Sequence, residues 1–158
     1  MTDILITGLG ATLIMDIQAL LRRRLSGVAG LDYALVGRWL GHMPQGRYVH
    51  ASIRDATAVR GEKWLGWSFH YLTGVVFAAV LILLWGPDWV AEYGIWPGLI
   101  TGWLTAALPL FVMQPAFGLG CCASRTPAPW RARFNTLLTH TVFGVGLWLS
   151  ALLSTGFV

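Results

Sequence analysis

Residues 64–85 read WLGWSFHYLTGVVFAAVLILLW and contain no Asp, Glu, Lys or Arg. At about 1.5 Å of rise per residue, a helix over this run is roughly 33 Å long, and a hydrocarbon core is about 30 Å thick. Trp64 and Trp85 stand at its two ends, as expected for aromatic side chains at the level of lipid headgroups. The run therefore predicts a membrane-spanning helix over Trp64–Trp85.

Three more apolar runs of similar length follow the same pattern: Ile4–Leu21, Ile95–Pro115 and Thr136–Phe157. The chain is 56% hydrophobic and 11% charged, whereas about 25% charged residues is usual in a soluble domain. A water-soluble fold would have to bury four apolar helices within 158 residues and would keep too little polar surface. We therefore predict an all-α polytopic membrane protein, with a four-transmembrane-helix bundle as a single membrane domain over residues 1–158.

The eleven Lys and Arg residues lie in two segments, 22–63 and 125–133, whereas residues 87–95 carry only Asp88 and Glu92 as charged groups. Cationic loops are retained on the cytoplasmic side during insertion, so we expect cytoplasmic loops after the first and third helices and external termini. The first run is preceded by no cation, which favours a retained helix over a cleaved signal peptide. The net charge of +4 then faces anionic lipid headgroups rather than nucleic acid. Headgroup contacts are assigned to Arg22, Arg23, Arg24 and Arg38.

The cytoplasmic loop 22–63 is long enough to hold structure of its own. Asp32 is placed to cap a short interfacial helix over 33–43, because its side chain accepts from the first free backbone N–H groups. A second, weakly patterned helix is predicted over 48–59. Interfacial surface positions are expected for the two histidines of the loop, His42 and His50.

Each predicted span carries a polar side chain toward its cytoplasmic end, and these are Asp16, His70, Gln114 and His140. Burying such groups in lipid costs free energy unless they find partners. Small residues recur beside them at helical spacing, as Gly8 and Thr12 do before Asp16, and such faces are where helices approach closely in lipid. The pattern predicts a polar pocket that opens to the cytoplasm and binds a proton or a small polar ligand. The alternative is that Asp16 pairs with a histidine and only fixes helix packing.

Metal or haem binding is a second alternative, because two imidazoles and a carboxylate form a suitable ligand set. The candidate ligands are Asp16, His70 and His140. No H-x-x-x-H, C-x-x-C or H-E-x-x-H spacing occurs, so no cofactor is the first expectation. Cys121 and Cys122 are interpreted as ordinary small loop residues, and no catalytic motif points to an enzyme.

The second and fourth helices share a faint pattern, HYLTGV at 70–75 and HTVFGV at 140–145. This pattern is compatible with two helical hairpin repeats in parallel orientation. Chance similarity between apolar helices is the other explanation, and the residues do not decide between them.

Four stretches carry a resemblance to one known family: GATLIMD (10–16), ALVGRWLGHMP (34–44), FVMQP (111–115) and SRTP (124–127). Over nearly its whole length the chain resembles a family of uncharacterised bacterial four-helix inner-membrane proteins, a domain of unknown function. The resemblance implies a multi-pass protein of the bacterial inner membrane, and together with the charge segregation this places both termini on the periplasmic side. It supplies no activity.

These observations favour a component of small-solute or proton-linked transport, in which Asp16, His70 and His140 line the pocket together with Gln114. Four helices leave little room for a private pathway, so we expect a homo-oligomer or a partner membrane subunit within the lipid bilayer. Membrane-embedded metal or haem binding and a non-catalytic assembly role are the alternatives. An enzymatic role is less favoured.

Overall fold

The computed structural model describes residues 2–28 and 30–156, and within these residues it contains helices and loops but no strand. Four helical segments are long and apolar enough to span a membrane: Asp3–Ser26, Glu62–Trp85, Trp96–Ala116 and Pro129–Ser154. The prediction of an all-α chain with four such helices is confirmed. The predicted end of the last helix at Phe157 lies outside the described residues.

Two helices extend further than the apolar runs at the ends that carry arginines. α1 (Thr2–Ser26) continues through Arg22, Arg23 and Arg24, and α7 (Pro129–Thr155) begins before Arg131. Long cationic side chains can reach polar surroundings from within a helix, so the helix need not end where its apolar run ends. Proline is also well tolerated in the first turn of a helix, which accounts for the start of α7 at Pro129.

The chain forms two compact units, and each unit draws on separated stretches of sequence. Unit 1 comprises residues 1–30, 71–105 and 137–158, and unit 2 comprises residues 31–70 and 106–136. α1 and α5 (Trp96–Thr105) belong to unit 1, as does α4 (Trp89–Tyr93). α3 (Glu62–Trp85) and α7 begin in unit 2 and end in unit 1.

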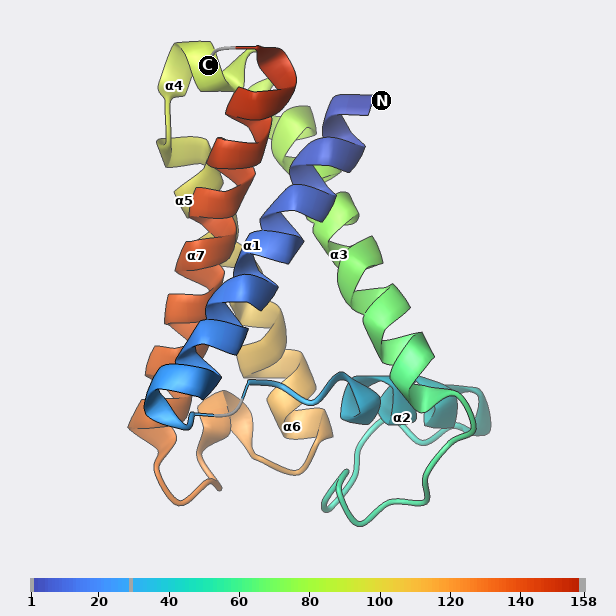
Figure 1. The fold of residues 1–158 in the computed structure, drawn as a ribbon. Coiled ribbons are helices and arrows are strands. Elements are labelled where there is room, and N and C mark those ends of the chain that lie inside the picture. Colours follow the sequence, from blue (N-terminus) through green and yellow to red (C-terminus); the bar gives the residue numbers. More distant parts are fainter. Residues whose placement is uncertain (1, 29, 157–158) are drawn as a thin grey trace. The chain divides into compact units, whose positions relative to one another are not determined.

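Unit 1 is a bundle of α1, α5 and the later parts of α3 and α7 (Figure 1). Small residues let the helix backbones meet. A Cβ atom added to Gly8 would lie 2.6 Å from Val75 Cα, and one added to Gly98 would lie 2.6 Å from the Gly144 oxygen. The predicted close approach along small-residue faces is therefore confirmed for these helices. The buried apolar side chains around them include Ala78, Leu81, Phe143 and Leu147.

The outer surface of unit 1 is strongly apolar. Large side chains stand exposed on each of its long helices, for example Leu13 at 52%, Leu83 at 84%, Leu104 at 67% and Leu153 at 69%. Soluble monomers rarely expose contiguous apolar surface of this kind, whereas acyl chains favour it. The outward leucines therefore agree with the four helices that are able to span a membrane.

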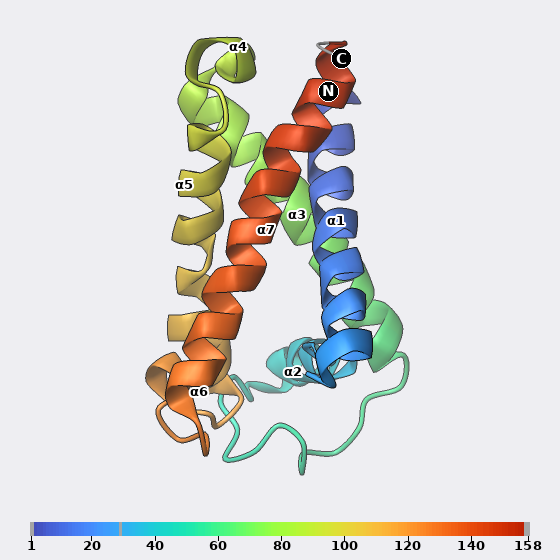
Figure 2. The same ribbon diagram turned by 60° about the vertical axis from the view of Figure 1, so that its left-hand side comes forward.

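The charges of unit 1 differ between its two ends. The start of α1, the helix α4 and the end of α7 lie at the same end of this unit (Figures 1 and 2). That end carries Asp3, Asp88 and Glu92, and the described residues there include no Lys or Arg. Arg22 and the two arginines after it lie at the opposite end of α1.

Unit 2 contains the two cationic loops and several short helices. These are α2 (Tyr33–His42), the 3₁₀ turn η1 (Met43–Gln45), the π-helical segment η2 (Pro109–Met113), α6 (Gln114–Ala116) and the 3₁₀ turn η3 (Cys121–Ala123). Asp32 Oδ1 accepts from the backbone N–H of Ala34 at 3.0 Å, so the predicted N-cap of α2 is confirmed. The apolar core of this unit consists of Leu35, Val36, Ile53, Ala116 and Phe117.

The weakly patterned helix predicted over 48–59 is wrong. Residues 47–59 form extended chain and turns instead. Their backbone groups bond to a distant part of the sequence, because His50 N donates to the Ala116 oxygen at 2.8 Å and Ile53 N to the Phe117 oxygen at 3.2 Å. Long-range bonds of this kind replace the local ladder that a helix would need.

The third span is interrupted near its two prolines, Pro109 and Pro115. Residues Pro109–Met113 form a π-helical turn, in which the N–H of Gln114 donates to the Pro109 oxygen. Proline has no N–H to donate and its ring crowds the preceding turn, so the helix widens at this point. Pro115 follows within α6.

Candidate functional site

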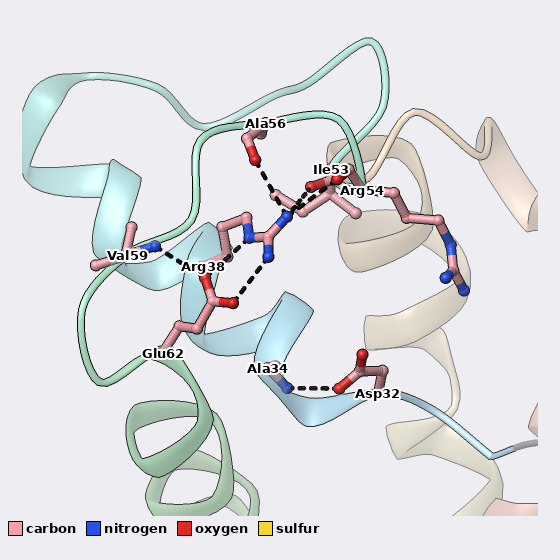
Figure 3. A network of polar contacts seen from close by, with 8 residues as sticks. All are labelled: Asp32, Ala34, Arg38, Ile53, Arg54, Ala56, Val59 and Glu62. Atoms are coloured by element: carbon pink, nitrogen blue, oxygen red, sulfur yellow. Dashed lines mark hydrogen bonds and ion pairs between the residues drawn. The ribbon is translucent and has the colours of Figure 1, made fainter.

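Arg38 is the centre of a polar network that organises the first cationic loop (Figure 3). Its Nε donates to Glu62 Oε2 at 2.9 Å and its Nη2 to Glu62 Oε1 at 2.8 Å, a fork-to-fork ion pair. Its Nη1 donates to three carbonyl oxygens, those of Ile53 at 3.3 Å, Arg54 at 3.0 Å and Ala56 at 3.1 Å. The hydrogen bonds that Arg38 donates to the Glu62 carboxylate raise the pKa of the guanidinium above its ordinary value. Arg38 therefore ties α2, the start of α3 and the intervening loop together.

Arg38 is one of the arginines for which the sequence predicts a contact with a lipid headgroup. The side chains of Arg38 and Glu62 are only 14% and 16% exposed, and the guanidinium donors point at protein oxygens. The guanidinium of Arg38 is therefore engaged in contacts within the protein. Arg23 and Arg24 are exposed at the end of α1, and headgroup contacts by Arg22 and these two residues stay a prediction.

Two histidines of the same loop contact each other directly. His42, the last residue of α2, is 4% exposed, so its expected surface position is wrong. Its Nδ1 lies 2.8 Å from Nε2 of His50, and the two rings are stacked. A hydrogen bond between two ring nitrogens needs one donor and one acceptor. The pair can therefore hold at most one extra proton while this bond persists.

The loop that carries His50 is held by contacts from three directions. Trp39 Nε1 donates to the Tyr48 oxygen at 2.8 Å, two residues before His50. The backbone N–H of His50 is bonded to Ala116, and Ile53 is buried in the apolar core of unit 2. His50 is thus fixed beside His42 by the fold rather than by sequence neighbours.

The histidine pair lines a pocket of about 460 Å³ within unit 2. A volume of this size falls in the range of about 300–1,000 Å³ that is typical of small-molecule sites. Arg47 and Asp55 are the other charged lining residues, and Ser52 and Thr57 add hydroxyl groups. Nδ1 of His50 is buried and has no hydrogen-bond partner among the residues that the structure describes. The lining of the pocket therefore combines opposite charges, hydroxyl groups and the paired imidazoles.

The sequence matches a family model described as Protein of unknown function (DUF2938), over residues 5–154. The chain belongs to the DUF2938 family. No curated protein and no solved structure matches it. The predicted membership of a family with no assigned function is confirmed, and function must be argued from side-chain chemistry.

In this DUF2938 protein, two of the predicted site residues lie in unit 1. Tyr71 Oη donates to Asp16 Oδ2 at 2.9 Å. Nδ1 of His140 lies 3.0 Å from Thr105 Oγ1. The Thr105 hydroxyl already donates its one proton to the Gly102 oxygen at 2.9 Å, so it accepts from His140. With the hydroxyl proton donated to Gly102, a neutral His140 imidazole that donates to Thr105 carries its proton on Nδ1.

The other two predicted site residues lie in unit 2. The His70 ring stacks on Tyr33 with centroids 4.1 Å apart and meets the edge of Trp67 at 5.8 Å. Gln114 is 6% exposed, and its Nε2 donates to Thr136 Oγ1 at 3.2 Å. Its Oε1 is buried without a partner among the described residues. Gln114 therefore has the unmet acceptor that a polar pocket would offer a ligand.

Asp16 and His140 belong to one unit and His70 to the other, and a pocket shared by all three stays a prediction. Within residues 2–28 and 30–156, no group of three or more His, Cys, Asp or Glu side chains is placed to hold a metal ion. Cys121 and Cys122 are free thiols with their sulfur atoms 3.9 Å apart. Burial raises the pKa of the Cys122 thiol, and its contact with the neighbouring Cys121 thiol adds to that effect.

Sequence reasoning missed the pocket of unit 2. His42 and His50 are eight residues apart, which is not a spacing that marks a ligand pair on one helix face. The available signal was the crowding of Arg47, Asp55 and both histidines into one short loop. These residues were predicted to lie on an interfacial surface, because nothing in the local sequence shows that the loop folds back onto Ala116 and Phe117.

Proposed function

We propose that this protein is a small-solute or proton-linked transport component of a bacterial inner membrane, with Asp16 as its main proton-binding group. The observation that carries the proposal is the 2.9 Å hydrogen bond from Tyr71 Oη to Asp16 Oδ2. It joins α1 to α3, two helices that are each long and apolar enough to span a membrane.

An ionisable group in a span is costly to bury and usually serves a function. The Tyr71 hydroxyl can donate to an Asp16 carboxylate or to the carbonyl oxygen of the protonated acid. The bond therefore survives a change of protonation, and Asp16 can gain or lose a proton while keeping its partner. This property suits proton coupling.

His140 is the second proton-exchanging group of the proposal. Its Nδ1 lies 3.0 Å from Thr105 Oγ1, and this contact orients the ring. Imidazole is the side chain whose charge can change between about pH 5 and 8, which is why a histidine suits a proton-coupled role. His70 and Gln114 are retained as further lining residues of the solute path.

The proposed orientation places the start of α1, the helix α4 and the end of α7 on the periplasmic side. The support is electrostatic, because that end of unit 1 carries Asp3, Asp88 and Glu92, whereas eight of the eleven cations lie in unit 2 and the other three end α1. The proposed partners are the bilayer and a second copy of the chain or another membrane subunit.

The test uses the full-length protein in liposomes that contain a pH-sensitive dye. An inside-negative potassium diffusion potential drives proton entry, alone and with external amino acids, sugars, carboxylates or phosphate. Wild-type protein should acidify the lumen faster than protein-free liposomes under at least one condition. Asp16→Asn should abolish this difference, and Asp3→Asn, the same change at the exposed end of α1, should retain it.

Two results would overturn the proposal. One is a wild-type rate equal to that of protein-free liposomes under every condition, and the other is full activity of the Asp16→Asn protein. Tyr71→Phe separates transport from a purely structural role. It keeps the carboxylate and should slow proton entry without abolishing it, whereas an assembly role predicts lost stability of Tyr71→Phe and no proton movement in any variant.

A further inference from the structure

We infer that the pocket around His42 and His50 binds a small, singly charged oxyanion, a carboxylate or a phosphate diester, together with one proton. The inference uses only residues of unit 2 and does not depend on the proposed function.

The fixed charges of the pocket cancel. Arg47 and Asp55 both line it and have opposite sign. Behind His42, Glu62 lies within electrostatic reach of its ring, but Glu62 is bound in the fork-to-fork ion pair with Arg38. The histidine pair therefore sets the net charge of the pocket, which is zero for the neutral pair and +1 for the singly protonated pair.

The singly protonated pair always carries a proton on Nδ1 of His50. The inner hydrogen bond joins His42 Nδ1 to His50 Nε2 and contains one proton. If His42 is the imidazolium, neutral His50 accepts at Nε2 and bears its own proton on Nδ1. If His50 is the imidazolium, both of its nitrogens are protonated. In either case the protonated pair presents an N–H at this nitrogen.

That N–H is the one without a partner. Nδ1 of His50 is buried and makes no hydrogen bond with the described residues. An unsatisfied buried donor is unfavourable, and an anionic acceptor relieves it with a charge-assisted hydrogen bond. An oxyanion and the extra proton therefore stabilise each other in this pocket.

The remaining lining residues define the ligand more closely. Arg47 offers a planar guanidinium that suits carboxylate and phosphate oxygens, and Ser52 and Thr57 offer hydroxyl donors. Asp55 would repel a second negative charge, so a single charge is preferred. A free solute and a lipid phosphodiester both have this chemistry, and the experiment must separate them.

The experiment titrates the full-length protein in neutral detergent with acetate and with dimethyl phosphate, followed by calorimetry at pH 6 and pH 8. Both probes keep a charge of −1 over this range, so any pH dependence belongs to the protein. Binding should be several-fold tighter at pH 6. His50→Gln should remove that pH dependence.

Matched variants test the charge assignments. Arg47→Gln should weaken binding about tenfold or more, as loss of a charged donor does. Arg60→Gln makes the same change at an exposed arginine of the same loop that does not line the pocket, and should leave binding unchanged. Asp55→Asn should tighten binding. Asp16→Asn should have no effect, so failure of the proposed transport function would leave this result intact.

A lipid source is tested by native mass spectrometry of protein from nanodiscs of phosphatidylglycerol and phosphatidylcholine. Retention of phosphatidylglycerol by wild type but not by Arg47→Gln, with no binding of either soluble probe, would assign the pocket to a lipid headgroup. Binding of a soluble probe would assign it to a free solute. The inference is overturned if no probe distinguishes wild type from Arg47→Gln, or if Asp55→Asn weakens binding.

Discussion

Replacing Arg38 with methionine is the sharpest test of how unit 2 is held together. The change removes five hydrogen bonds, two to the Glu62 carboxylate and three to loop carbonyls. Methionine has a similar length and a good helix propensity, so α2 itself should tolerate it. What remains is a carboxylate of a side chain that is 16% exposed, without its counter-charge.

The expected cost follows from this burial. Removing one partner of a buried ion pair typically costs about 3–5 kcal/mol, because the other charge is left uncompensated. Glu62 keeps one donor, the Val59 N–H at 2.9 Å, and retains some contact with solvent. We therefore expect the lower end of that range, about 3 kcal/mol of unfolding free energy.

The assay is unfolding of the purified protein in mixed micelles with a rising fraction of an anionic detergent, followed by tryptophan fluorescence. Arg60→Met, at an exposed position of the same loop, should stay within about 0.5 kcal/mol of wild type. The double variant Arg38→Met/Glu62→Met should be more stable than Arg38→Met alone, since no buried charge remains. The reasoning is refuted if Arg38→Met unfolds like Arg60→Met, or if the double variant is the least stable of the set.

Three further predictions follow from local geometry. A Cβ on Gly37 would overlap a backbone carbonyl of α3, whereas one on Gly41 would crowd the Cβ and both methyl groups of Val59, which would have to shift. Gly37→Ala should therefore cost about 2 kcal/mol or more in the same unfolding assay, and more than Gly41→Ala. A membrane-impermeant maleimide applied to intact spheroplasts should label a cysteine placed at Asp88 and should reach Cys121 only after permeabilisation; the reverse pattern would invert the proposed orientation. Because burial raises the pKa of Cys122, permeabilised Cys121→Ser protein should react more slowly at pH 7 than Cys122→Ser protein, and equal rates would contradict this.

Hydropathy and small-residue spacing were sufficient to predict the long helices of unit 1 and the faces along which they approach other helices. Apolar runs of membrane length need no tertiary information to be recognised, because every backbone group is satisfied within the helix. The glycines of α1, α3, α5 and α7 also indicate where these helices approach one another, since close helix approach in lipid requires small side chains. The N-cap of α2 at Asp32 could also be predicted, because it depends on a hydrogen bond to a residue only two positions away.

The first cationic loop could not be predicted because its bonds are long-range. Residues 47–59 are held by acceptors at Ala116 and Phe117 and by the guanidinium of Arg38. A pattern read within a window of the chain contains none of these partners. The burial of His42 follows from the same fold-back, so a residue assigned to the surface became part of a pocket.

Tyr71 was missed for a different reason. It follows His70 directly, and consecutive residues on a helix point about 100° apart. The small-residue pattern identifies only the helix face of His70. Tyr71 lies on the neighbouring face, and its hydroxyl donates to Asp16. A tyrosine within a span is one of the few side chains that pair an apolar ring with a proton donor, and this was the available signal.

The neutral links between helices bear on whether Asp16 has a structural or a functional role. Three threonines each donate to a carbonyl of their own helix and accept from another helical segment of the same unit, namely Thr105 from His140, Thr136 from Gln114, and Thr141 from Trp103. Such links, with the close glycine contacts, fix helix packing without any net charge. A carboxylate in the same setting is more costly to bury than a neutral amide, and an asparagine at this position could still accept the Tyr71 hydrogen bond. What aspartate adds is the exchange of a proton, so Asp16→Asn is the variant in which packing and function should separate.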